Sequence, residues 1–168
     1  MKAAIVYSHK ANKTSKAANL IKQATGMESL KDIDIEEADL STIKGFDLLI
    51  LGSPTWFDGE LAVYWDELVP EIEDTDFSKS KIAIFGNGDQ LGYPENFGDA
   101  VGLLAEVFEN SGATMIGKTS TKEYTFESSK ALEGEYFKGL ILDFENQHKM
   151  NKARVESWVK SLLEQLKD

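Results

Sequence analysis

The chain has 168 residues, a net charge of −11 and no cysteine, and 42% of its residues are hydrophobic. The length suits one domain, and the composition is that of a globular protein rather than a disordered chain. The lack of cysteine excludes disulfides, thiolate nucleophiles and cysteine-ligated metal sites, and it fits a reducing cytoplasm. The acidic balance disfavours nucleic-acid binding, and no apolar run is long enough to span a membrane.

The charge is unevenly distributed along the chain. Residues 1–25 carry five lysines and no acidic residue, whereas the rest carries 13 basic and 29 acidic residues. Net charge bears first on solubility, so a solvated acidic surface is one interpretation. In the other, the acidic surface docks a basic partner, and the lysines form a local positive site near the N-terminus.

Short apolar runs alternate with amphipathic segments throughout the chain. Strands are expected at 3–7, 33–35, 48–51 and 82–85, and in two halves at 114–116 and 140–142. Helical spacing of apolar residues indicates helices at 14–23, 64–72, 97–108 and 155–166.

The strands are apolar throughout rather than alternating, which is typical of a parallel sheet covered by helices on both faces. We therefore expect an α/β fold, a single doubly wound domain over 1–168, with 118–137 as an insertion between the halves of the fifth strand. Ligands of such sheets bind beyond the carboxyl ends of the strands. Three loops follow strands there: 8–14, 53–60 and 86–97.

The first loop reads Ser8, His9, Lys10, Ala11, Asn12, Lys13 and Thr14. Backbone N–H groups at a helix N-terminus form an anion site, which the hydroxyls and positive charges of this loop would strengthen. The loop lacks both Gly-Lys-Ser/Thr and a glycine-rich dinucleotide fingerprint. An ordinary solvated loop, with Asn12 or Thr14 as the helix cap, is the alternative.

The second loop reads Ser53, Pro54, Thr55, Trp56, Phe57, Asp58, Gly59 and Glu60. Two adjacent large aromatic residues after a buried strand cannot both enter the core easily, so one is available to cover a planar ligand. Alternatively, Trp56 packs on the edge of the fold.

The third loop runs from Gly86 to Phe97 and includes Asn87, Gly88, Asp89, Gln90, Tyr93 and Asn96. Its three glycines allow the backbone to approach a ligand closely, Tyr93 offers a second flat surface, and N–H groups near Asp89 and Gln90 could donate to a ring edge. A long turn that needs glycine only for its shape is the alternative. Together the three loops predict a site for a planar ring with a phosphate tail, for which FMN is the simplest choice. No catalytic residue and no metal ligand is assigned.

At these residues the sequence resembles the flavodoxins, and it is similar to the long-chain type found in cyanobacteria. The resemblance rests on Gly52-Ser53-Pro54-Thr55-Trp56 with Gly59-Glu60-Leu61, and on Gly88-Asp89-Gln90-Leu91-Gly92-Tyr93 with Asn96-Phe97. It covers essentially the whole chain and implies a flavodoxin-like five-stranded parallel sheet of order 2-1-3-4-5. The stretch 118–137 corresponds to the long-chain insertion.

The resemblance also implies roles for individual residues. Trp56 and Tyr93 would enclose the isoalloxazine ring, and the peptide between Phe57 and Asp58 would lie at flavin N5. The loop 87–90 would contact the pyrimidine edge, residues 8–14 would hold the phosphate, and further residues would lie close to the flavin. These further residues are Pro54, Thr55, Gly59, Asn96, Phe97, Asp143 and Glu145.

The phosphate loop departs from the family pattern Thr-x-Thr-Gly-x-Thr. The corresponding residues here are His9, Lys10, Ala11, Asn12, Lys13 and Thr14, so two hydroxyls and the glycine are missing. Backbone donors do not depend on side-chain type, and positive charge from Lys10, Lys13 or His9 is expected to offset the lost hydrogen bonds.

The resemblance implies a cytoplasmic, low-potential one-electron carrier with non-covalently bound FMN, which would substitute for ferredoxin rather than act as an enzyme.

 Such a carrier has no substrate turnover of its own and passes electrons between redox proteins. Its expected partners have basic docking faces, such as ferredoxin–NADP reductase, photosystem I or other ferredoxin-dependent enzymes. A monomer is expected, because the flavin edge must stay exposed. Two properties are expected of the bound flavin: a strongly reducing second step, and a turn of the Phe57–Asp58 peptide on one-electron reduction.

The main alternative is a flavodoxin-like binding or regulatory module that has lost FMN. A phospho-receiver domain is disfavoured, because it needs an acidic cluster after the first strand, where this chain has Ser8-His9-Lys10. A hydrolase is disfavoured as well, because neither His9 nor His148 lies in a nucleophile-elbow context.

Overall fold

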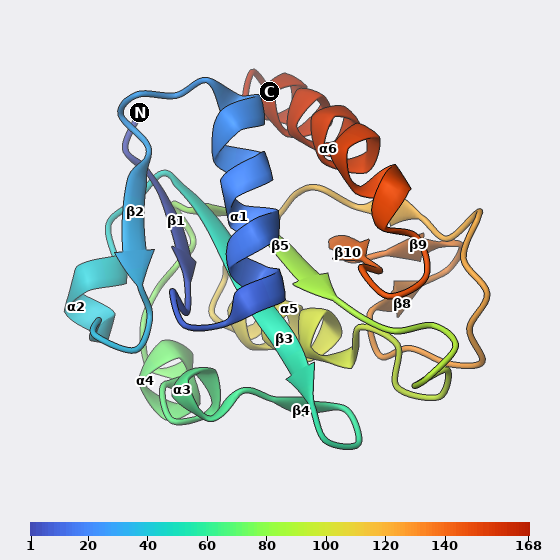
Figure 1. Ribbon diagram of the computed structural model, residues 1–168. Helices are drawn as coiled ribbons and strands as arrows, with labels where there is room; N and C mark the ends of the chain where they lie inside the picture. Colours follow the sequence, from blue (N-terminus) through green and yellow to red (C-terminus); the bar gives the residue numbers. More distant parts are fainter.

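A parallel sheet forms the middle layer of the computed structural model, which describes all residues from 1 to 168 (Figure 1). Its main strands are β1 (Ala3–Tyr7), β2 (Lys31–Asp34), β3 (Leu48–Trp56), β5 (Lys81–Asn87) and β10 (Leu140–Leu142). They lie in the order β10-β5-β3-β1-β2. Numbered along the chain, these five strands have the predicted order 2-1-3-4-5.

Helices cover both faces of the sheet (Figure 1). Helices α1 (Asn12–Thr25) and α6 (Asn151–Gln165) pack together on one face. Helix α5 (Asp99–Asn110) covers the other face with the short helices α2 (Leu40–Ile43), α3 (Val63–Asp66) and α4 (Val69–Glu73). The structure therefore has the doubly wound architecture that the uniformly apolar strands predict.

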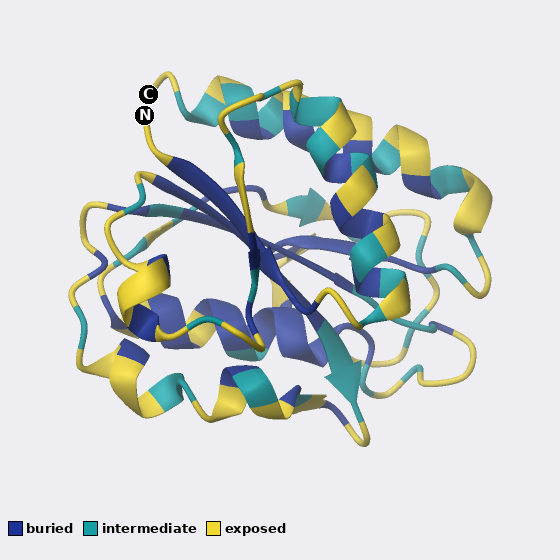
Figure 2. Cartoon of the chain, turned by 60° about the vertical axis from the view of Figure 1, so that its left-hand side comes forward, coloured by how far each residue is buried: buried dark blue, intermediate teal, exposed yellow.

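The core consists of two apolar layers, one on each side of the sheet (Figure 2). Successive residues of a strand point to opposite faces, so Ala4 and Val6 of β1 pack toward α5, whereas Ala3, Ile5 and Tyr7 pack toward α1 and α6. Both layers exclude water, which is why the inner strand β1 is apolar throughout, whereas the edge strand β2 alternates between polar residues and the buried Ile33.

The fifth strand position is occupied by two separate segments. Strand β6 (Thr114–Met115) pairs with the start of β5, and β10 pairs with its end. Between them, β7 (Thr119–Ser120), β8 (Leu132–Glu133) and β9 (Tyr136–Phe137) form a small antiparallel sheet.

Two local predictions differ from the structure. The single helix expected over 64–72 is wrong, because α3 and α4 are separate helices. Pro70 lies in the first turn of α4 and has no N–H with which to continue the hydrogen-bond ladder of α3. The third strand does not stop at Gly52; β3 extends to Trp56 and forms a hairpin with β4 (Glu60–Leu61).

The 3₁₀ turn η1 (His148–Met150) leads into α6. None of the helices combines the length and the apolar character needed to cross a lipid bilayer.

Candidate functional site at the carboxyl edge of the sheet

Two adjoining cavities lie where β1, β3 and β5 end, and Lys13 and Asn87 line both of them. The first cavity has a volume of about 400 Å³ and the second about 480 Å³. The first is lined by Ser8, Lys10, Ala11, Asn12, Lys13, Thr14, Glu36, Pro54, Trp56, Tyr64 and Asn87. The second is lined by Lys13, Thr55, Phe57, Asp58, Asn87, Gly88, Asp89, Tyr93 and Asn96.

Helix α1 begins at the first cavity. Its N-cap residue is Ala11, which makes no side-chain cap hydrogen bond, so the N–H groups of the first helical turn have no intrahelical partner. The preceding loop is closed by a 3.1 Å hydrogen bond from Ala11 N–H to the Ser8 carbonyl. Uncapped N–H groups and the positive end of the helix dipole make this an anion-binding position.

The single threonine retained in the loop faces away from solvent. Thr14 is buried, and its hydroxyl donates a 3.1 Å hydrogen bond to Asn87 Oδ1 at the end of β5. This contact joins the start of α1 to the neighbouring strand and fixes the boundary between the two cavities.

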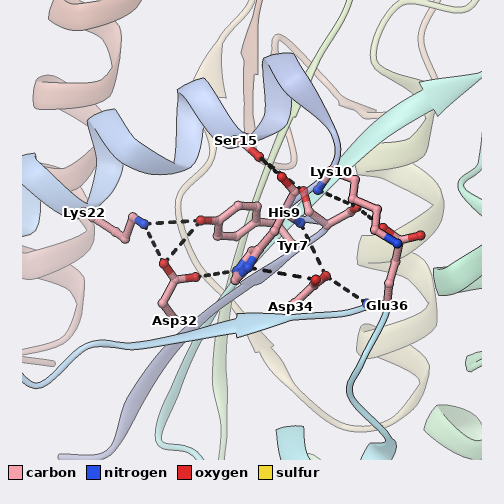
Figure 3. Close-up of polar contacts among 9 residues, drawn as sticks. Tyr7, His9, Lys10, Ser15, Lys22, Asp32, Asp34 and Glu36 are labelled. Carbon is pink, nitrogen blue, oxygen red and sulfur yellow. Dashed lines mark hydrogen bonds and ion pairs between the residues drawn. The ribbon is translucent and has the colours of Figure 1, made fainter.

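His9 lines neither cavity, and its side chain points toward Asp32 and Asp34 (Figure 3). His9 Nε2 lies 2.9 Å from Asp32 Oδ1, and Nδ1 lies 3.9 Å from Asp34 Oδ2. His9 N–H also donates to Asp34 Oδ1 at 3.4 Å. The histidine therefore ties the loop to β2, and only Lys10 and Lys13 remain as cationic residues in the lining of the first cavity.

Asp32 links β1, β2 and α1. It accepts hydrogen bonds from Lys22 Nζ at 2.6 Å and from the Tyr7 hydroxyl at 3.3 Å (Figure 3). Partial burial by itself raises the pKa of Asp32, but the hydrogen bonds from Lys22 and His9 outweigh this effect and lower the pKa below its ordinary value.

Two residues of the first cavity come from outside the loops that the sequence singled out. Glu36 follows β2 and accepts a hydrogen bond from the Ser8 hydroxyl. Tyr64 lies on α3, and its buried hydroxyl has no hydrogen-bond partner. Helical spacing predicted only a core position for Tyr64, and no sequence signal pointed to Glu36.

The aromatic residues are distributed over both cavities. Trp56 lines the first cavity. Its ring packs edge-on against the rings of Tyr64 and Phe57, with distances between ring centroids of 5.7 Å and 6.4 Å. Tyr93 lines the second cavity and is 62% exposed, and Phe57 is 77% exposed. Such exposed rings offer apolar surface to a planar ligand.

The β3–β4 turn is strained at the residue that follows Trp56. Phe57 has a φ of 49°, which is unusual for a bulky residue, and Gly59 has a φ of 96°. Gly59 N–H donates to the Trp56 carbonyl at 3.2 Å, and Asn96 Nδ2 donates to the Asp58 carbonyl at 2.9 Å. A side chain at position 59 would collide with Asp99, so only glycine fits there.

Asp143 holds the loop after β5 in place through hydrogen bonds. Its buried carboxylate accepts hydrogen bonds from the backbone and side chain of Gln90, from Glu145 N–H and from Asn146. The sequence analysis expected the Gln90 N–H to be free for a ring edge, but the structure commits it to Asp143 at 3.1 Å. Gln90 therefore stabilises the conformation of the loop through its hydrogen bonds to Asp143.

Two further predicted residues lie beside the cavities rather than in their lining. Phe97 is fully buried among Tyr124, Phe126 and Phe137, where it supports the glycine-rich loop. Glu145 forms an ion pair with Lys13, the residue shared by both cavities.

Comparisons with known proteins agree with this geometry. The family model described as Flavodoxin matches residues 5–158. A flavodoxin of Nostoc sp. is 38% identical over 161 residues, which cover 96% of this chain and 95% of that protein. Flavodoxin 1 of Escherichia coli is 36% identical over 163 residues, which cover 96% and 93%.

A solved structure gives the same result at the level of the fold. The crystal structure of Fusobacterium nucleatum flavodoxin bound to flavin mononucleotide superposes with a TM-score of 0.91 at 26% identity, covering 97% of each chain. The chain described here therefore belongs to the flavodoxin family.

Proposed function

We propose that this protein is a one-electron carrier that binds FMN non-covalently and passes electrons between redox proteins. Its family membership supports this function, and the relative from F. nucleatum is described with bound flavin mononucleotide. The observation that carries the proposal is that the two cavities adjoin at Lys13 and Asn87, which line both of them. An uncapped helix start at one end and exposed aromatic rings at the other suit a phosphorylated planar molecule.

The residues present fit the phosphate and the ring of FMN. The first-turn N–H groups of α1, together with Lys10 and Lys13, are our proposed phosphate ligands, and Ser8, Asn12 and Thr14 complete the loop around them. The buried, unpartnered hydroxyl of Tyr64 is a further polar group at this end. We assign the ring to Thr55, Trp56, Phe57, Asp58, Gly59, Asn87, Gly88, Asp89, Tyr93 and Asn96, held in place by Gln90.

FMN supplies the redox chemistry when it is bound, and the chain positions it and sets its electrostatic surroundings. We propose that the peptide between Phe57 and Asp58 changes orientation with redox state, so that the Phe57 carbonyl becomes a hydrogen-bond acceptor. The positive φ of Phe57 supports this idea, because a strained residue stores free energy that a change of conformation releases. Crystal structures of both redox states with an unmoved peptide would exclude it.

Acidic residues surround the ring end of the site. Hydrogen bonds from the Gly92 N–H, and further from Asn146 and the Leu91 N–H, lower the pKa of Asp89, so this carboxylate remains ionised at neutral pH. Nearby negative charge disfavours the addition of a further negative charge. We therefore propose a strongly reducing carrier, and a redox titration that gives no couple below that of free FMN would contradict this.

We propose partners with basic docking faces, such as ferredoxin–NADP reductase, photosystem I or another ferredoxin-dependent enzyme. The support is the net charge of −11, which steers basic surfaces toward the protein in a salt-dependent way. In this role the protein is a carrier without a substrate of its own.

Titration of the apoprotein with FMN and with riboflavin tests the proposed function. We expect saturable binding of FMN, yellow holoprotein and reversible one-electron reduction. Riboflavin binding isolates the contribution of the ring from that of the phosphate. An apoprotein that stays colourless in excess FMN would contradict the proposal and favour a module that has lost the cofactor.

A further inference from the structure

Three carboxylates of β2 and the turn after it lie near the phosphate loop, and one of them, Glu36, lines the first cavity. Asp32 and Asp34 alternate along β2 with Ile33, which enters the core, and Glu36 lies in the turn that follows β2. Alternation places the two aspartates on the side of the phosphate loop, and Glu36 reaches the same side. His9 and Lys22 bind Asp32, and His9 also contacts Asp34, whereas Glu36 binds the Ser8 hydroxyl and lines the cavity (Figure 3).

Both hydroxyl groups of the phosphate loop therefore already donate hydrogen bonds within the protein. Thr14 donates to Asn87, and Ser8 donates to the carboxylate of Glu36. A phosphate at the helix start would have to take the Ser8 hydroxyl from an anion, and it would then lie beside that anion. Glu36 thus opposes a phosphorylated ligand in two ways: by competing for a donor and by repelling like charge.

Tyr64, unlike Glu36, offers a hydrogen-bond donor that would favour a phosphate. Its buried hydroxyl lies near the Ser8 side chain but forms no hydrogen bond of normal geometry, although a buried hydroxyl normally finds a partner. Burial first, and then the charge of Glu36, raise the pKa of Tyr64 to about 12, so the phenol keeps its proton and can act as a donor. A phosphate oxygen is an acceptor that this hydroxyl lacks in the present arrangement.

We propose that Glu36 and Tyr64 determine, in opposite directions, how strongly this site prefers a flavin with a phosphate over one without. Glu36 weakens the preference and Tyr64 strengthens it, in place of the two threonine hydroxyls that the loop lacks. The inference rests on the proposed binding of FMN and concerns residues outside the phosphate loop.

Replacement of Glu36 tests the first half of the proposal. In the apoprotein variant Glu36→Gln we expect the Kd for FMN to fall about fivefold at low salt, as for removal of a partly exposed like charge, while the Kd for riboflavin changes less than twofold. Glu37→Gln is the matched control, because the neighbouring exposed residue carries the same charge and does not line the cavity. Equal effects of the two variants would overturn the role of Glu36.

Replacement of Tyr64 tests the second half. Tyr64→Phe keeps the ring that contacts Trp56 and removes only the hydroxyl. We expect the Kd for FMN to rise about fivefold, as for loss of one hydrogen bond to a charged acceptor, while the Kd for riboflavin is retained. A parallel loss of affinity for both flavins would show that Tyr64 acts only by supporting Trp56, and would overturn its role as a donor.

The same titrations separate this inference from the proposed function. A wild-type apoprotein that binds neither flavin contradicts both. A wild-type apoprotein that binds both flavins, with an FMN-to-riboflavin preference that neither variant changes, contradicts the inference alone and leaves the proposed function standing.

Discussion

The two cavities share Lys13 and Asn87 but are built in different ways. The first, at the start of α1, is lined by Lys10, Lys13 and Glu36 among mostly uncharged residues, and its loop is tied to β2 through His9 and Asp32. The second is lined by the exposed rings of Phe57 and Tyr93 and by charged and polar residues, on loops that Asp143 and Asn96 hold by hydrogen bonds. The first cavity thus offers a helix start and two lysines to an anion, whereas the second offers exposed rings to a planar group. Salt and pH should act mainly on the first cavity, and loop integrity mainly on the second.

The largest effect is expected from Asp143, which supports the loop of the second cavity. Asp143→Ala leaves the backbone and side-chain donors of the buried Gln90 without their acceptor, so we expect the free energy of unfolding to fall by about 3 kcal/mol. Urea unfolding measures this change. Glu145→Ala is the control, because it removes an exposed acid two residues away; a loss as large as that of Asp143→Ala would exclude the special role of Asp143.

Tyr93 tests the apolar character of the second cavity. We expect Tyr93→Ala to weaken FMN and riboflavin binding equally, by about tenfold, because stacking on an aromatic ring contributes about 1–3 kcal/mol. Flavin fluorescence titration gives both Kd values. Tyr136→Ala is matched in chemistry and is also exposed, but it lies on β9 away from both cavities, and it should change neither. A selective loss of FMN affinity would instead place Tyr93 at the phosphate.

Lys13 tests the charge of the first cavity. We expect Lys13→Met to raise the Kd for FMN about threefold at low salt and to reduce its salt dependence, since one cation beside the phosphate is removed. The Kd for riboflavin should stay the same. Lys16→Met, three residues further along α1 at an exposed position outside the first cavity, controls for net charge. Equal salt dependence of FMN and riboflavin binding in the wild type would rule out this prediction.

The smallest effect is expected from the Asp32 bridge. Because the pKa of Asp32 is lower in the folded protein, its contribution is present above the unfolded pKa, near 3.8, and is lost as the pH falls through the folded value. We expect Asp32→Asn to lower stability by less than about 1 kcal/mol at pH 7, given its partial exposure. In urea unfolding, the difference should shrink as the pH falls below the unfolded pKa and through the lowered folded pKa. A difference that grows toward acid pH would contradict the sign.

Much of the fold follows from patterns that are local in the sequence. Continuous apolar strands indicated a sheet covered on both faces, and the order of β10, β5, β3, β1 and β2 agrees with the flavodoxin-like expectation. The exceptions are also local in origin: Pro70 separates α3 from α4, and β3 continues past Gly52 because β4 pairs with its end. Hydrophobic periodicity alone predicts neither the loss of a backbone N–H at a proline nor the pairing of a strand with an antiparallel neighbour.

The sequence by itself determined which loops meet at the carboxyl edge of the sheet, because strand order fixes where strand ends lie. Only the tertiary structure decided which side chains face the cavities. In the structure, His9 faces β2 and Gln90 is hydrogen-bonded to Asp143. Glu36 and Tyr64 lie with Ser8 in the lining of the first cavity. The physical reason is that charged and buried polar groups take the partners that lie nearest in space, and those partners here come from strands and helices distant in the chain.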